Sequence, residues 1–164
     1  MKLLAAFIIG AIALPLLIVA VGLLGFLPSN ATSGPPKWEE SIGMRALDAS
    51  LEKRSGGLKN PIAAKDSAAF AAGKKQYDDG CSGCHGDAKG PSDWGAKGFY
   101  PRAPQFFQEG SDVTPEEAFA AIHDGVRYSG MGAWKNMLTD HQIWQVANYV
   151  AHIPEPKEGS ARMH

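Results

Sequence analysis

The sequence has few of the cysteines and basic clusters from which zinc sites and nucleic-acid interfaces are commonly built. Its 164 residues include only two cysteines, Cys81 and Cys84. A zinc site would therefore need further ligands from scattered histidines. The formal net charge is -1 and no basic cluster appears, so nothing indicates nucleic-acid binding. One domain is the expectation for a chain of this length.

Charged and strongly polar residues are absent from Leu3 to Leu27, a run of 25 positions. A helix of that length could cross a hydrocarbon core of roughly 30 Å. A cleaved signal peptide usually has a shorter apolar core, of about 7–15 residues, although Ser29-Asn30-Ala31 would suit a signal peptidase. We therefore expect a transmembrane anchor over residues 1–27, with a signal peptide as the alternative. Lys2 precedes the run and favours a cytoplasmic N-terminus.

Both cysteines fall in the pentapeptide Cys81-Ser82-Gly83-Cys84-His85, which has the form of a c-type haem attachment site. Two thiols three positions apart can each form a thioether with a porphyrin, and the adjoining imidazole can then bind the iron. A redox pair or half of a zinc site are the alternatives. The first lacks a βαβ context, and the second would put adjacent Cys84 and His85 on one small ion. We therefore predict one covalent haem c, with His85 as a metal ligand.

A linker, residues 28–65, separates the apolar run from the rest of the chain. Its first part is rich in Ser, Gly and Pro. Residues 37–54 predict an amphipathic helix, because apolar residues recur there at near-helical spacing. The four that define the spacing are Trp38, Ile42, Leu47 and Leu51. Such a helix would pack on its own domain, or alternatively lie on a bilayer or dock against a membrane partner.

Three helices are expected in a domain over residues 66–153. Asp66 or Ser67 can cap the first, and Thr114 and Thr139 open the second and third with capping boxes. Gly73 lies inside the first helix at a cost of about 1 kcal/mol against alanine, which suggests close approach of another helix. The predicted fold class is therefore all-α.

The remaining segments of this region are loops. A Gly- and Pro-rich stretch, residues 86–112, is unusually long for a compact domain unless it is functional, and here it would wrap a cofactor. The domain is small, so the haem would supply part of its apolar core. The polar tail, residues 154–164, is expected to be disordered.

An ordered set of motifs runs through the region 66–153. It consists of Gly73-x-x-x-Tyr77, the cysteine motif, Gly130-Met131-Gly132-Ala133-Trp134, and Leu138 to Tyr149. As a set it resembles the class I (monohaem) c-type cytochromes, of the membrane-anchored bacterial kind. The resemblance implies the cytochrome c fold, with long loops around one haem. It also implies that Gly73 and Tyr77 pack against Tyr149, and that Met131 is the distal iron ligand.

The residues around Met131 agree with that role. Flanking glycines let the backbone approach a flat cofactor closely. Met137 is the nearest competing methionine, and His123 is the first histidine alternative.

Other residues are candidates for the haem pocket. A backbone carbonyl should accept the free ring N–H of His85. The resemblance implies a proline carbonyl, for which Pro91 is the first candidate, ahead of Pro101. Arginines suit carboxylates best. The side chains that could reach the propionates or cover the ring are Trp94, Tyr100, Arg102, Arg127 and Trp134.

Together these features predict a membrane-tethered electron carrier rather than an enzyme, either a subunit of a respiratory or photosynthetic oxidoreductase complex or a shuttle to one. Its partner would be a membrane-embedded redox complex or a periplasmic redox protein. Because bacterial haem attachment occurs outside the cytoplasm, we expect the inner membrane with the haem domain on the periplasmic side. The alternatives are a five-coordinate haem that binds or reduces a small ligand, and a haem-stabilised structural subunit.

Overall fold

The computed structural model describes residues 2–27, 29–63 and 65–154. The chain divides into two compact units, Met1–Asn30 and Ala31–His164. The helices are α1 (Lys2–Leu23), α2 (Lys37–Ser55), α3 (Ser67–Gly80), α4 (Ser82–His85), α5 (Asp93–Lys97), α6 (Phe106–Glu109), α7 (Pro115–Asp124) and α8 (Asp140–Ala151). The all-helical prediction is confirmed. The expected disordered tail lies, apart from Pro154, outside the described residues.

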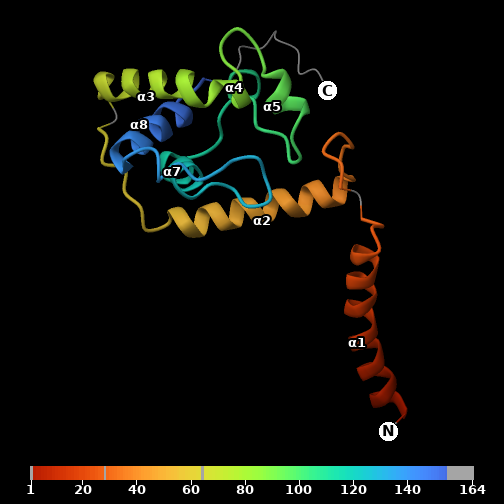
Figure 1. Cartoon of the computed structure of the whole chain (residues 1–164). Coiled ribbons are helices and arrows are strands. Elements are labelled where there is room, and N and C mark those ends of the chain that lie inside the picture. The colour runs from red at the N-terminus through yellow and green to blue at the C-terminus, as the bar shows by residue number, and fades with distance from the viewer. Residues whose placement is uncertain (1, 28, 64, 155–164) are drawn as a thin grey trace. The chain divides into compact units, whose positions relative to one another are not determined.

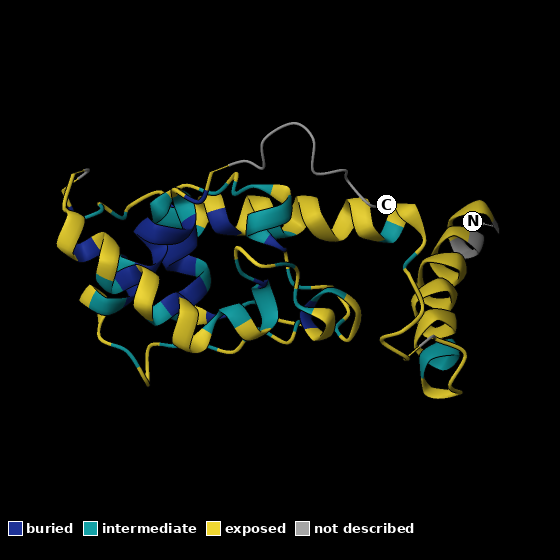
Figure 2. Ribbon diagram, turned by 90° about the horizontal axis from the view of Figure 1, so that it is seen from above, coloured by how far each residue is buried: buried dark blue, intermediate teal, exposed yellow. Residues whose placement is uncertain are grey.

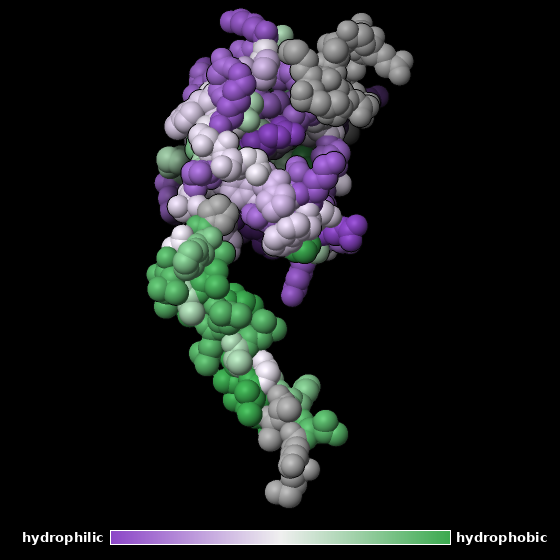
Figure 3. Space-filling view, turned by 90° about the vertical axis from the view of Figure 1, so that its right-hand side faces the viewer, coloured by the Kyte–Doolittle hydropathy of each residue, from purple (hydrophilic) through white to green (hydrophobic). Residues whose placement is uncertain are grey.

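The first unit corrects one prediction. Within the described residues, no helix combines the length and the apolar character needed to cross a membrane. The expected transmembrane helix over residues 1–27 is therefore wrong. The apolar run does not continue as one helix: the chain leaves α1 after Leu23, and Gly25 adopts a φ of 79°. Apolar side chains nevertheless gather along this unit (Figure 3).

The crossing of α3 and α8 organises the second unit (Figure 1). A Cβ added at Gly73 would lie 2.1 Å from the carbonyl oxygen of Gln145 and 3.1 Å from the Cβ of Tyr149. Tyr77 lies one turn further along α3, and its ring centroid is 5.4 Å from that of Tyr149. The predicted close approach at Gly73 and the packing of Tyr77 against Tyr149 are confirmed.

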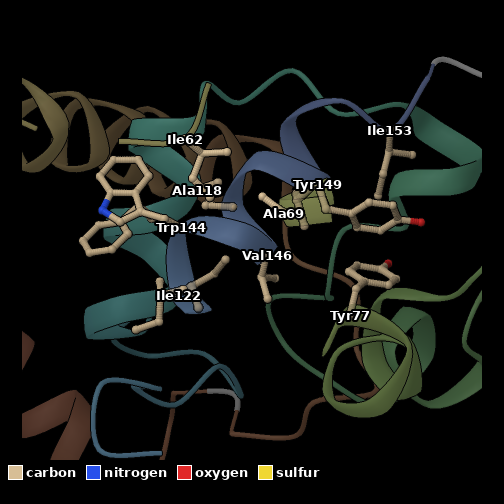
Figure 4. Close-up of a cluster of buried hydrophobic side chains, with 13 residues drawn as sticks. Ile62, Ala69, Tyr77, Ala118, Ile122, Trp144, Val146, Tyr149 and Ile153 are labelled. Atoms are coloured by element: carbon tan, nitrogen blue, oxygen red, sulfur yellow. The ribbon is translucent and has the colours of Figure 1, made fainter. Parts of the chain in front are cut away.

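The helices α7 and α8 begin where the sequence predicts. Thr114 and Thr139 each form a complete capping box, with Glu117 and Gln142 respectively. Both helices turn an apolar face inward, and Ile143 is fully buried. Figure 4 shows this core, in which Trp144 of α8 lies near Ala118 and Ile122 of α7.

α2 packs its C-terminal half against α7. Leu51 and Ser55 are buried there, whereas Trp38 and Ile42 are 66% and 62% exposed. The N-terminal half of α2 is exposed along most of its length (Figure 2). The prediction of a helix packed on its own domain is therefore confirmed for the C-terminal half, and only Leu51 of the predicted apolar stripe is buried.

Candidate functional site

α4 is a single helical turn that carries the cysteine motif. The carbonyl of Cys81 accepts hydrogen bonds from the amides of Cys84 at 3.0 Å and His85 at 2.9 Å. Residues three positions apart on such a turn lie on one face, so the two cysteines lie on the same side. Both are half-buried and no disulfide joins them. Burial, with a smaller effect from Cys84, raises the pKa of Cys81 to about 11, so this thiol is protonated at neutral pH.

The imidazole of His85 is held in one orientation. Its Nδ1 lies 2.9 Å from the carbonyl oxygen of Pro104. A carbonyl only accepts, so Nδ1 carries the proton and the lone pair of Nε2 is free to bind a metal. Burial lowers the pKa of His85, against the opposing effect of the Pro104 hydrogen bond, which favours the neutral form that binds metals. The Phe106 ring stacks on the imidazole, with centroids 5.0 Å apart.

The acceptor for His85 differs from the sequence prediction. The sequence predicts the carbonyl of Pro91 or Pro101 as the acceptor, and for this hydrogen bond both are wrong, because the acceptor is Pro104. Pro91 lies beside Gly86 instead, where a Cβ added at Gly86 would come within 3.0 Å of its Cα. The path of the long loop brings Pro104 to the imidazole.

Gln105 explains that path, and sequence reasoning missed it. Its side chain is 3% exposed and bridges three backbone groups. Oε1 accepts from the amide of Ser92 at 2.8 Å, and Nε2 donates to the carbonyls of Cys84 at 2.9 Å and Ala103 at 2.8 Å. The loop is thereby tied to α4, which places the neighbouring Pro104 beside His85. No local pattern marks a glutamine that links segments far apart in sequence.

Met131 lies in a loop that is held by hydrogen bonds between its own residues. Its amide donates to Ser129 Oγ at 3.1 Å, and its carbonyl accepts from the amide of Val126 at 3.1 Å. Gly125 begins the loop with a φ of 73°, and a Cβ there would lie 2.8 Å from the amide nitrogen of Ala133. The left-handed φ and the close approach both favour glycine at this turn.

The two methionine candidates have different surroundings. Met131 is half-buried and packs against the hydrophobic core, whereas Met137 is 66% exposed. His123 is engaged elsewhere: its ring stacks on Phe119 with centroids 5.3 Å apart, and its Nδ1 lies 2.9 Å from Asp124 Oδ1. These surroundings favour Met131 over both alternatives.

Trp134 brings the Met131 loop to the cysteine motif. Its amide donates to the carbonyl of Ile122 at 3.0 Å, which fixes the end of the loop against α7. Its indole packs on Gly80, where an added Cβ would lie 3.0 Å from Cη2. Gly80 immediately precedes Cys81, so the loop that carries the predicted distal ligand reaches the turn that carries the predicted proximal one.

Comparison with known proteins places this arrangement in a family. The family model described as cytochrome c oxidase, cbb3-type, subunit III matches residues 68–150, half of the chain. The chain belongs to this family. Membership confirms the resemblance to c-type cytochromes, and it implies haem c as the cofactor and electron transfer as the function.

One solved structure is also similar to part of the cytochrome. It is cytochrome cL from the marine methylotrophic bacterium Methylophaga aminisulfidivorans, which is 27% identical with a TM-score of 0.39. The match covers 53% of this chain and 54% of that one, about half of each, and so low a score supports no structural argument. Among curated proteins, none is significantly similar to the chain.

The residues of the cytochrome fit a haem better than the alternative of zinc. In the described part of the chain, no three His, Cys, Asp or Glu side chains gather where they could hold a metal ion. Two free thiols on one helical turn, next to an imidazole with a free Nε2, instead provide the donors that haem c requires.

The remaining pocket candidates have other neighbours. The Tyr100 hydroxyl donates to Glu39 of α2, and Arg102 pairs with Glu109 at 2.6 Å. Arg127 is exposed, with no ion pair to another described residue. Trp94 is 65% exposed and its ring lies 4.9 Å from that of Phe99. Roles of these residues toward a haem stay predictions.

Proposed function

We propose that the cytochrome carries single electrons between redox partners, with one haem c attached covalently through Cys81 and Cys84. His85 and Met131 would bind its iron. The haem supplies a one-electron ferric–ferrous couple when bound. The observation that carries the proposal is the hydrogen bond from His85 Nδ1 to the Pro104 carbonyl, because it leaves Nε2 as a free donor beside two free thiols.

The chain's own residues hold the two ligands. The Pro104 carbonyl and the Phe106 ring orient the imidazole, which keeps Nε2 directed away from Pro104. Hydrogen bonds at both the amide and the carbonyl of Met131 hold its backbone, and its half-buried side chain packs against the hydrophobic core. Methionine ligation raises the reduction potential of c-type cytochromes.

We further propose that the partner is a redox enzyme complex of the membrane or a soluble redox protein, on the extracytoplasmic side. The family's description names an oxidase subunit, which supports a respiratory complex. The side of the membrane follows from the place where bacteria attach haem to this motif. Weak electron-transfer encounters bury less than about 1,200 Å², so we expect brief docking rather than a large interface.

Optical spectroscopy of the purified protein with Met131→Ala tests this function. We expect ferric wild type to show the thioether-to-iron charge-transfer band and the ferrous form to bind carbon monoxide only slowly. Met131→Ala should abolish the band and let carbon monoxide bind rapidly. Met137→Ala is the matched control, because its exposed side chain should leave both results unchanged.

A high-spin wild-type spectrum that shifts readily with carbon monoxide would contradict the proposal and favour the five-coordinate alternative. Loss of the band in Met137→Ala alone would move the ligand to Met137. If an exchange of electrons with small mediators could not be detected, the structural-subunit alternative would replace the carrier.

A further inference from the structure

α2 lies outside residues 68–150, the part of the chain that the family model matches, yet it contacts Gly125 in the Met131 loop and Tyr100 in the loop between α5 and α6. We propose that α2 is a strap that positions the Met131 loop, with Arg54 and Glu39 as its two positioning residues. This inference rests on the proposed role of Met131 as an iron ligand. Figure 1 shows α2 running past these loops.

Arg54 attaches the C-terminal end of the strap. Its Nη1 donates to the carbonyl oxygen of Gly125 at 3.5 Å and lies 4.0 Å from Asp124 Oδ2. Gly125 is the residue at which the Met131 loop leaves α7. Lys135, at the far end of the same loop, also reaches Asp124, at 2.9 Å. Both ends of the loop therefore meet next to Arg54.

Glu39 attaches the N-terminal end of the strap. It accepts a hydrogen bond from the hydroxyl of Tyr100. The neighbouring Phe99 packs its ring against Gly130, so closely that a Cβ at Gly130 would lie 2.6 Å from Cε1 of the ring. Gly130 immediately precedes Met131. A series of contacts thus runs from Glu39, at the end of α2 opposite Arg54, to the residue before the predicted ligand.

The helix couples these two contacts. Glu39 and Arg54 are 15 residues apart, which is about 22 Å along a helix. The buried side chains Leu51 and Ser55 fix the C-terminal end on α7, and a continuous helix transmits that position to Glu39. Trp38 and Ile42 of α2 contribute nothing to the packing of the helix on α7, because both side chains are exposed.

The test removes each attaching side chain in turn. Each variant is compared with a control in which an adjacent residue of the same charge is replaced. Arg54→Ala is paired with Lys53→Ala, and Glu39→Ala with Glu40→Ala; Lys53 and Glu40 are exposed on α2. The first readout is amide hydrogen exchange at Val126, whose acceptor is the carbonyl of Met131. The second is the rate at which ferrous full-length protein binds carbon monoxide, since this requires the Met131 loop to open.

We expect Arg54→Ala and Glu39→Ala each to raise both rates about fivefold, the effect of one net hydrogen bond, while both controls match wild type. Tyr100→Phe should reproduce Glu39→Ala, and the double variant should add nothing further, because the two groups act through one contact. If Tyr100→Phe changes the rates and Glu39→Ala does not, Tyr100 acts without α2 and the strap is overturned.

Failure of the strap and failure of the proposed function give different results. If Met131→Ala leaves the charge-transfer band intact, Met131 is not the ligand and both proposals fall. If Met131→Ala abolishes the band while the Arg54 and Glu39 variants behave like their controls, the carrier function stands and the strap alone is refuted.

Discussion

Replacing Gly73 by alanine tests the helix crossing on which the site is built. An alanine Cβ would lie 2.1 Å from the carbonyl oxygen of Gln145 and 2.6 Å from its carbonyl carbon. Non-bonded carbons are in optimal contact at about 3.5–4.0 Å, so α3 and α8 would have to separate by roughly 1 Å. The obstacle is backbone, so a change of side-chain rotamer cannot relieve it.

Two opposing contributions determine the size of the effect. Overpacking typically costs about 1–3 kcal/mol, and a clash with backbone belongs at the upper end of that range. Alanine favours the helix by up to about 1 kcal/mol over glycine. We therefore expect Gly73→Ala to lower the free energy of unfolding by about 2 kcal/mol.

Urea unfolding followed by far-ultraviolet circular dichroism measures this change. The slope of the free energy of unfolding against urea concentration should be the same in the variant and in wild type. Gly43→Ala is the control, because Gly43 lies inside α2 with no atom within 4 Å of an added Cβ. We expect that variant to gain up to about 1 kcal/mol. If Gly73→Ala were as stable as Gly43→Ala, the crossing would not be limited by contact at Gly73, and the steric reasoning would be refuted.

Three further changes have distinct expected results. Tyr77→Phe removes the hydroxyl that donates to the buried carbonyl of Gly86 at 2.9 Å, so urea unfolding should show a loss of about 1–3 kcal/mol; an unchanged midpoint would mean that water replaces the bond. Gln105→Ala leaves three backbone groups without their partner and should lose more than about 2 kcal/mol, together with a shifted haem spectrum because the Pro104 carbonyl moves; an unaltered spectrum would separate Gln105 from the site. The hydrogen bond from Lys135 holds the pKa of Asp124 below its usual range. Asp124 therefore stabilises the fold above about pH 4 and ceases to do so as the pH falls through its folded-state pKa. The free energies of unfolding of wild type and Asp124→Asn should therefore converge in acid and differ at neutral pH by less than about 1 kcal/mol; a difference that persisted at low pH would contradict this.

Local signals in the sequence determined most of the helices. The capping boxes at Thr114 and Thr139 form between residues three apart, so they act whatever the rest of the chain does. The cysteine motif is equally local, because one helical turn is enough to bring two thiols and an imidazole together. Gly73 carried longer-range information, since a glycine inside a helix is costly unless another backbone approaches it.

The N-terminal run shows where a local signal misleads. Its composition predicted one continuous helix across a membrane, but composition alone does not place the end of a helix. The chain leaves α1 after Leu23, with Gly25 at positive φ. The length of the apolar run therefore exceeded the length of the helix.

Only the tertiary structure decided which groups support the ligands. The choice of Pro104 rather than Pro91 depends on the path of a loop, and the adjacent Gln105 holds that path by donating to the carbonyl of Cys84. The contacts of α2 at Glu39 and Arg54 likewise join segments more than 60 residues apart. Caps and motifs act between near neighbours and can be recognised in the sequence, whereas these contacts exist only after the helices have packed, because packing alone brings such distant groups within hydrogen-bonding distance.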